Sequence, residues 1–144
     1  MRRDVYSGRL KLSCEDRETF QAVVCYASSL VSLERFDEAK ALMRKNIPVA
    51  RRVLGNNDET TIRMRWSYAL ALYADSGATL DDLREAVRTL EDLQRTARRV
   101  LGSTHPVAKS IDLSLATSRE ALRAREGLNS ISEAMAAMPP PGSA

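Results

Sequence analysis

The sequence predicts an all-α fold, an α-solenoid in which antiparallel helix pairs stack into a right-handed superhelix. The hexapeptide ARRVLG occurs at residues 50–55 and again at residues 97–102, an offset of 47, while Tyr26-Ala27 recurs as Tyr68-Ala69 at an offset of 42. Repeats of this length are typical of stacked helical arrays. Only six Gly and five Pro occur in 144 residues, too few for the many turns of a sandwich or barrel.

The two offsets differ by five residues, which predicts one insertion in the second unit. We expect the following organisation: 1–13, the end of a truncated preceding repeat; 14–56, repeat 1; 57–103, repeat 2 with a five-residue insertion near 77–81; 104–127, the first helix of repeat 3; 128–138, a short C-terminal capping helix; and 139–144, a flexible tail.

The first pair of helices is expected over about 15–33 and 37–54. Apolar residues of the first helix, from Phe20 to Val31, recur at helical spacing. Asp37 is a candidate N-cap of the second helix, and Gly55 is a candidate C-cap. Pro48 lies inside the second helix and is expected to kink or divide it near residues 46–47.

The second pair is expected over about 58–75 and 81–102. Gly77 should end the first helix of this pair, and either Thr79 or Asp81 should cap the second. Asp81 and Asp82 would then lie in its first turn, where negative charge is favourable.

A fifth helix is expected to begin after Thr104, a candidate cap, with Pro106 in its first turn. It should reach about Arg125, and Gly127 should interrupt it. A short final helix over about 130–138 should follow.

Composition argues against an enzyme. The chain has one histidine, His105, and two cysteines, Cys14 and Cys25, which are too few for a Cys/His zinc site. It lacks a Gly-rich phosphate loop, HExxH, GxSxG and an EF-hand loop. We therefore expect no catalytic residues, no metal and no cofactor, and we assign His105 to a junction between repeats.

Charge and hydropathy limit the partners and the compartment. A net charge of +3 and 5% aromatic residues make nucleic acid an unlikely partner. No apolar run approaches the length of a membrane helix, and no signal peptide is apparent, so a cytoplasmic protein is expected. Cys14 and Cys25 would lie about 16 Å apart on one helix, too far for a disulfide, and are expected to be buried thiols.

The junction between the second and third units is similar to that of a known family. Residues 101–106 read LGSTHP, residues 54–59 read LGNNDE, and Glu38-Ala39 and Glu85-Ala86 open the second helices. These features resemble a tetratricopeptide repeat of the kinesin light chain-like type, over roughly residues 14–126. The resemblance implies a non-catalytic protein–protein interaction scaffold that binds a peptide or partner surface through its concave face. The alternative is an accessory subunit within a larger assembly, with self-association or docking through exposed repeat ends.

In such a fold the first helix of each unit lines the groove. The register of Glu38-Ala39 places these candidates there: Gln21, Val24, Ser28, Arg63, Trp66, Leu70, Tyr73, Ser110, Leu113 and Thr117. Paired Asn residues, which contact cargo in true light chains, are replaced by Val24-Cys25, Trp66-Ser67 and Leu113-Ser114. Trp66 has two interpretations, an aromatic anchor in the groove or a packing residue between helices.

Two pairs of arginines occupy equivalent places near the ends of second helices, at 51–52 and 98–99. One interpretation is a basic stripe for an acidic partner. The other is ordinary exposed charge, because cations are favourable at a helix C-terminus.

Overall fold

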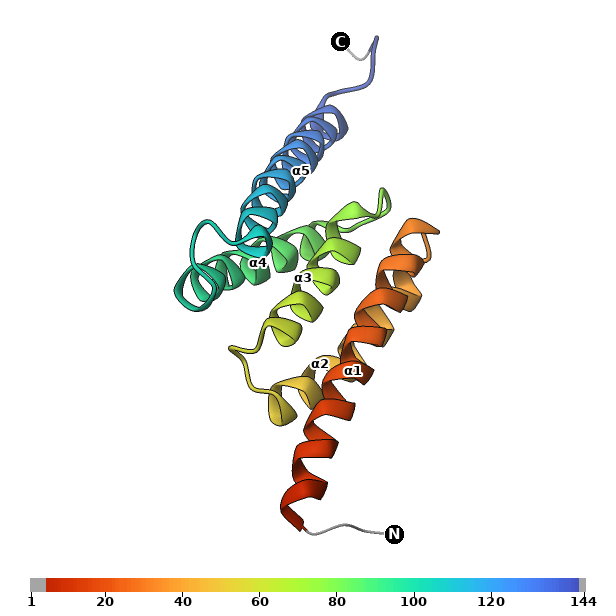
Figure 1. The fold of residues 1–144 in the computed structure, drawn as a ribbon. Coiled ribbons are helices and arrows are strands. Elements are labelled where there is room, and N and C mark those ends of the chain that lie inside the picture. Colours follow the sequence, from red (N-terminus) through yellow and green to blue (C-terminus); the bar gives the residue numbers. More distant parts are fainter. Residues whose placement is uncertain (1–4, 143–144) are drawn as a thin grey trace.

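The computed structural model of the protein describes residues 5–142, with side chains from residue 17 onward. These residues form five helices and no strand: α1 (Val5–Ser32), α2 (Phe36–Val53), α3 (Glu59–Ala74), α4 (Leu80–Val100) and α5 (Pro106–Ala137) (Figure 1). The predicted all-α fold of tetratricopeptide-like repeats is confirmed. Expectations for residues 1–4 and 143–144 fall outside the described residues.

The packing of the helices creates two different sides of the stack. Each helix packs on the next one in the chain, and α3 also contacts both α1 and α5. In the described part of the chain α2 and α4 do not contact each other. We call the side formed by α1, α3 and α5 the first-helix face, and the space between α2 and α4, with α3 as its floor, the second-helix groove.

The core consists of two main clusters that meet on α3. One contains residues of the first four helices, α1, α2, α3 and α4, and includes Phe20, Met43, Met64 and Leu72. The other joins α3, α4 and α5 through Ile62, Ala69, Leu90, Leu93, Ile111 and Leu115. Because neighbouring helices cover α3 on several sides, most of its residues are buried, and it positions side chains on both sides of the stack.

Two N-caps differ from the sequence expectation. Helix α2 begins at Phe36 after Arg35, so Asp37 lies in its first turn rather than at the cap. Helix α5 is capped by His105 rather than Thr104, and its Nδ1 accepts the backbone N–H of Val107 at 3.1 Å. Pro106 explains the second difference: its fixed φ suits the first helical position, so the residue before it becomes the cap.

Thr79, one of the two predicted caps of α4, forms a capping box with Asp82. The turn before it, residues 75–79, is longer than residues 33–35 between α1 and α2. Arg125 of α5 donates to the carbonyl oxygens of Ala78 and Ser76 in this turn. The longer turn therefore provides a contact that holds α5 against the end of α3.

Two predicted helix boundaries were wrong, and one of the two alternatives at Pro48 does not occur. Helix α1 begins at Val5 rather than near residue 15 and continues without a break through residues 13–14. Pro48 does not divide α2, because it removes only one backbone donor and Met43 and Ala50 are buried on either side of it. Gly127 does not interrupt α5, which continues to Ala137, since a single helical glycine costs only about 1 kcal/mol.

The expected short capping helix at 128–138 is thus the last part of α5. It projects away from the rest of the stack (Figure 1). All of its residues are exposed, and it covers no other helix of the described chain.

Candidate functional site

The ten predicted groove residues all retain solvent-accessible surface. Five are exposed: Gln21, Ser28, Arg63, Leu113 and Thr117. Five are partly buried: Val24, Trp66, Leu70, Tyr73 and Ser110. Their helices, α1, α3 and α5, make up the first-helix face. The register derived from the sequence therefore selects positions that a partner could reach.

Three of these residues meet in one cavity between α1 and α3. Gln21, Val24 and Arg63 line a volume of about 340 Å³ together with Cys25, Glu59 and Thr60. The sequence reasoning missed the last three, although Glu59 lies one helical turn before Arg63 and Cys25 follows Val24. Cys25 is exposed rather than buried, so the expectation of a buried thiol was wrong at this position. The side chain of Cys14 lies outside the described residues.

Glu59 organises the polar edge of this cavity. Its Oε2 accepts the Nε–H of Arg63 at 3.1 Å, and its Oε1 lies 3.4 Å from Nε2 of His105. The carboxylate is thus held between an arginine of its own helix and the histidine that caps α5. Beside it, Val24 supplies an apolar surface and Gln21 an amide. The cavity can offer both hydrogen bonds and hydrophobic contact to a bound chain.

Trp66 lies further along α3 and takes part in packing. Its indole Nε1–H donates to Oγ of Ser114 on α5 at 2.9 Å, and its ring packs against the cluster shared by α3, α4 and α5. The ring remains partly accessible. Much of the Trp66 side chain is therefore engaged in packing between helices.

The predicted residues of α5 stay separate from the cavity. Leu113 is 72% exposed, and the hydroxyl of Thr117 donates to the Leu113 carbonyl at 3.0 Å within the same helix. The structure therefore places three of the ten candidates in the cavity between α1 and α3 and three on α5. The other four line neither place: Ser28, Trp66, Leu70 and Tyr73.

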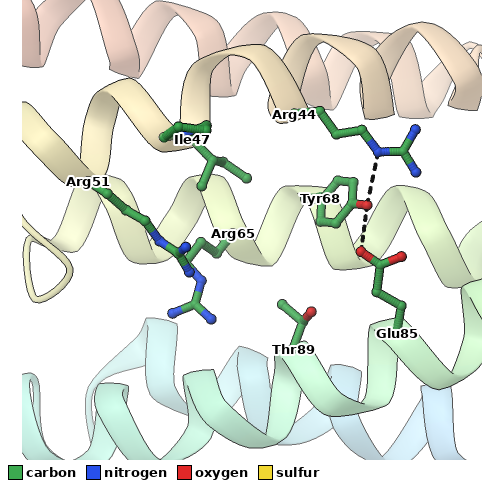
Figure 2. Close-up of a pocket in the computed structure, with 8 residues that line it drawn as sticks. Arg44, Ile47, Arg51, Arg65, Tyr68, Glu85 and Thr89 are labelled. Atoms are coloured by element: carbon green, nitrogen blue, oxygen red, sulfur yellow. Dashed lines mark hydrogen bonds between the residues drawn. The ribbon is translucent and has the colours of Figure 1, made fainter.

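A second polar region lies in the second-helix groove. Two cavities of about 400 and 500 Å³ adjoin there, and Arg51 and Arg65 line both. Figure 2 shows Arg44, Tyr68 and Glu85 at one end of the groove. Arg44 Nε donates to the Tyr68 hydroxyl at 3.1 Å, which donates to Glu85 Oε2 at 2.7 Å. Burial raises the pKa of Tyr68, and its hydrogen bond to Glu85 raises it further.

The four predicted arginines at 51–52 and 98–99 do not form one stripe. Arg51 and Arg99 line the same cavity, whereas Arg98 lies 3.3 Å from Asp112 of α5. Arg52 is exposed and lines no cavity described above. Sequence spacing placed the two pairs at equivalent positions, but adjacent residues on a helix point in different directions.

The described residues contain no group of His, Cys, Asp and Glu side chains arranged to hold a metal ion. Among the described helices, none combines the length and apolarity needed to cross a membrane.

Comparison with known proteins gives one match. The tetratricopeptide repeat family matches residues 27–59, from the second half of α1 to the start of α3. No curated protein and no solved structure matches the chain. Repeats of this family generally mediate protein–protein interaction and are generally non-catalytic. Together with the stack of five helices, the match supports a repeat protein of the tetratricopeptide type.

Proposed function

We propose that the protein is a non-catalytic interaction scaffold that binds a peptide or partner surface through its first-helix face. The observation that carries the proposal is the cavity between α1 and α3, where Gln21, Val24 and Arg63 meet. The LGSTHP junction supports the finer assignment to the kinesin light chain-like type. A cytoplasmic location is part of the same proposal.

The cavity suits the side chains of an extended segment better than a reacting small molecule. Its polar edge is a carboxylate already engaged by Arg63, and its apolar part is Val24. A bound segment would place one apolar side chain against Val24 and exchange backbone hydrogen bonds with Gln21. Binding of this kind needs complementary shape and donors, but no activated nucleophile or base.

The test is affinity capture from native lysate with the full chain, followed by mass spectrometry. The variants are Val24→Glu and Arg63→Glu, both on accessible positions of the cavity. Trp66→Ala is less suitable because it would also remove the hydrogen bond to Ser114. Arg88→Glu, on the exposed side of α4, is the matched control.

We expect partners that wild type and Arg88→Glu retain to be lost by both cavity variants. Retention of every partner by Val24→Glu and Arg63→Glu would contradict the proposal, provided that circular dichroism shows the variants to be folded.

The alternative function, an accessory subunit of a larger assembly, is favoured by the projecting part of α5. Leu128, Ile131 and Met135 are 63%, 58% and 66% exposed and share one face of the helix. Met138, which follows the last residue of α5, is 66% exposed. An assembly would cover this stripe. The variant Leu128→Ser with Ile131→Ser should then lose a complex of fixed stoichiometry that Val24→Glu retains, measured by light scattering.

A further inference from the structure

The second-helix groove holds two arginines in close proximity. Arg65 rises from α3 at the floor of the groove, with a side chain only 10% exposed, and its Nη2 lies 2.8 Å from Asp92 Oδ2. Arg51 comes from α2, and its guanidinium extends toward that of Arg65 (Figure 2). Among the described residues the guanidinium of Arg51 has no hydrogen-bond or ion-pair partner.

Arg51 is exposed to solvent overall, but a like charge acts on its guanidinium. Partial desolvation lowers the pKa of Arg51, the positive charge of Arg65 lowers it further, and Asp92 opposes these effects. Two guanidinium groups that share one carboxylate leave positive charge uncompensated. An anion bound between them would relieve the repulsion.

The cavity around these arginines has the composition of an oxyanion site. Its volume is about 500 Å³, and no apolar residue lines it. Three cations, Arg51, Arg65 and Arg99, and one carboxylate, Asp92, line it. Asp92 also lies 3.6 Å from Arg95, and Arg99 Nη2 donates to Asn57 Oδ1 at 3.5 Å. Two asparagine amides from the turn between α2 and α3, and one threonine hydroxyl of α4, complete the lining. Three cations against one anion give a local charge of +2, surrounded by hydrogen-bond donors.

We propose that this cavity binds a phosphate monoester carried by a partner protein. A phosphorylated side chain brings a charge of about −1.5 to −2 and three acceptor oxygens, whereas a carboxylate would neutralise only half of the excess. Guanidinium groups bind phosphate oxygens in pairs, which makes arginine suited to this role. The site lies on the opposite side of α3 from the first-helix face, so it is separate from the proposed peptide cavity.

A protein-borne phosphate fits the surface better than a nucleic acid backbone. A duplex or strand needs a track of cations that follows successive phosphates. Arg98 is engaged by Asp112, Arg52 lies outside the cavity, and Arg44, at the other end of the groove, is engaged by Tyr68. The cations left to bind an anion in the groove are therefore those that line this one cavity. The confined site matches a single phosphoryl group.

The experiment measures binding of a short phosphoserine peptide with alanine and glycine neighbours to the full chain by calorimetry. Its unphosphorylated twin is the ligand control, and inorganic phosphate is the competitor. The variants are Arg51→Gln and Arg99→Gln, which keep the pair between Arg65 and Asp92 intact. Arg52→Gln changes the neighbouring exposed arginine of α2 and is the matched protein control.

We expect the phosphorylated peptide alone to bind, and inorganic phosphate to displace it. Arg51→Gln should weaken binding roughly tenfold or more, since it removes charge-assisted hydrogen bonds, and Arg99→Gln should weaken it in the same direction. Arg52→Gln should leave the affinity unchanged. Without ligand, Arg51→Gln should unfold at the same temperature as wild type or higher, because it removes a repulsion.

Three results would overturn the inference: equal binding of the phosphorylated and unphosphorylated peptides, an equal loss with Arg52→Gln, or displacement by an RNA oligonucleotide at lower concentration than by inorganic phosphate. Val24→Glu tests the two sites independently, because it changes the first-helix face and leaves the arginine cavity unchanged. The phosphopeptide should bind this variant as it binds wild type, whether or not the first-helix face binds a partner.

Discussion

The turn from α2 to α3 and the turn from α4 to α5 have similar backbones, although their glycine N–H groups donate to carbonyls four and five residues earlier. Each follows the sequence ARRVLG, and the glycines, Gly55 and Gly102, have φ of +91° and +94°. Gly55 N–H donates to the Arg51 carbonyl at 3.0 Å, and Gly102 N–H donates to the Ala97 carbonyl at 3.2 Å. A left-handed residue at this point ends the helix and turns the chain into the next unit.

The side chains at the two turns are nevertheless different. Asp58 caps α3, whereas His105 caps α5. Each cap also contacts an earlier first helix: Arg17 of α1 lies 2.6 Å from Asp58, and Glu59 of α3 lies 3.4 Å from His105. In the first turn the acidic residue of the pair, Asp58, is the cap itself. In the second turn the acidic residue, Glu59, belongs to the earlier helix. The repeat thus retains the backbone of the junction while its charges are exchanged.

The strongest test of the shared backbone is to substitute the two glycines. Gly55→Ala and Gly102→Ala should each lower the free energy of unfolding by about 1–2 kcal/mol, because a Cβ is strained at positive φ. Nothing lies within 4 Å of either added Cβ, so the cost should be similar at both turns. Urea denaturation of the full chain measures it.

Gly127→Ala is the control for this pair, because Gly127 lies inside α5 with open space around it. This change should be neutral or stabilising by up to about 1 kcal/mol. If Gly102→Ala left the free energy of unfolding unchanged, a glycine with positive φ would not be required at this turn.

The difference between the two caps predicts a smaller effect. Asp58→Ala should cost about 1 kcal/mol in the free energy of unfolding, because it removes the acceptor of the Thr60 N–H at 2.9 Å and the partner of Arg17. His105→Ala should cost less, because its contact with Glu59 is longer. Urea denaturation of both variants at one pH compares them, and a larger cost at His105 would reverse this ranking.

The smallest predicted effect is the acid sensitivity of the first junction. Burial raises the pKa of the Asp58 carboxyl, but hydrogen bonds from Arg17 and Thr60 outweigh it and hold the pKa below its ordinary value of 3.8. The folded state therefore binds this proton less readily than the unfolded state. Its contribution to stability is present above pH 3.8 and is lost as the pH falls through the folded value.

Asp58→Asn keeps an acceptor at the cap and removes the charge. Thermal unfolding between pH 5 and pH 2 should show a shallower loss of stability for this variant than for wild type. An identical pH profile would mean that the pair with Arg17 contributes no measurable stability.

Local signals predicted much of the fold because they act over one or two helical turns. Apolar spacing and the two Leu-Gly sequences predicted the helix pairs, and Thr79 was among the predicted caps. Breaker residues gave two errors inside helices. Pro48 and Gly127 each weaken a helix by a limited amount, and whether the helix continues depends on the sum over all its residues.

The candidate site was only partly accessible to sequence reasoning. The repeat register predicted Gln21, Val24 and Arg63, because equivalent positions of first helices face the same side. It missed Glu59, whose role depends on a contact with His105 across a junction. A register identifies a face, but it contains no information on which side chains of that face reach one another.

The sequence by itself determined the helix pairs and the two glycine turns between them, because backbone conformation and hydrophobic periodicity are properties of neighbouring residues. Only the tertiary structure decided which charges meet. Arg51 faces Arg65, and Arg125 of α5 reaches Ser76 in the turn between α3 and α4. These contacts depend on how closely α3 approaches its neighbours and on the separation of α2 from α4, which are set by the packing of the whole stack.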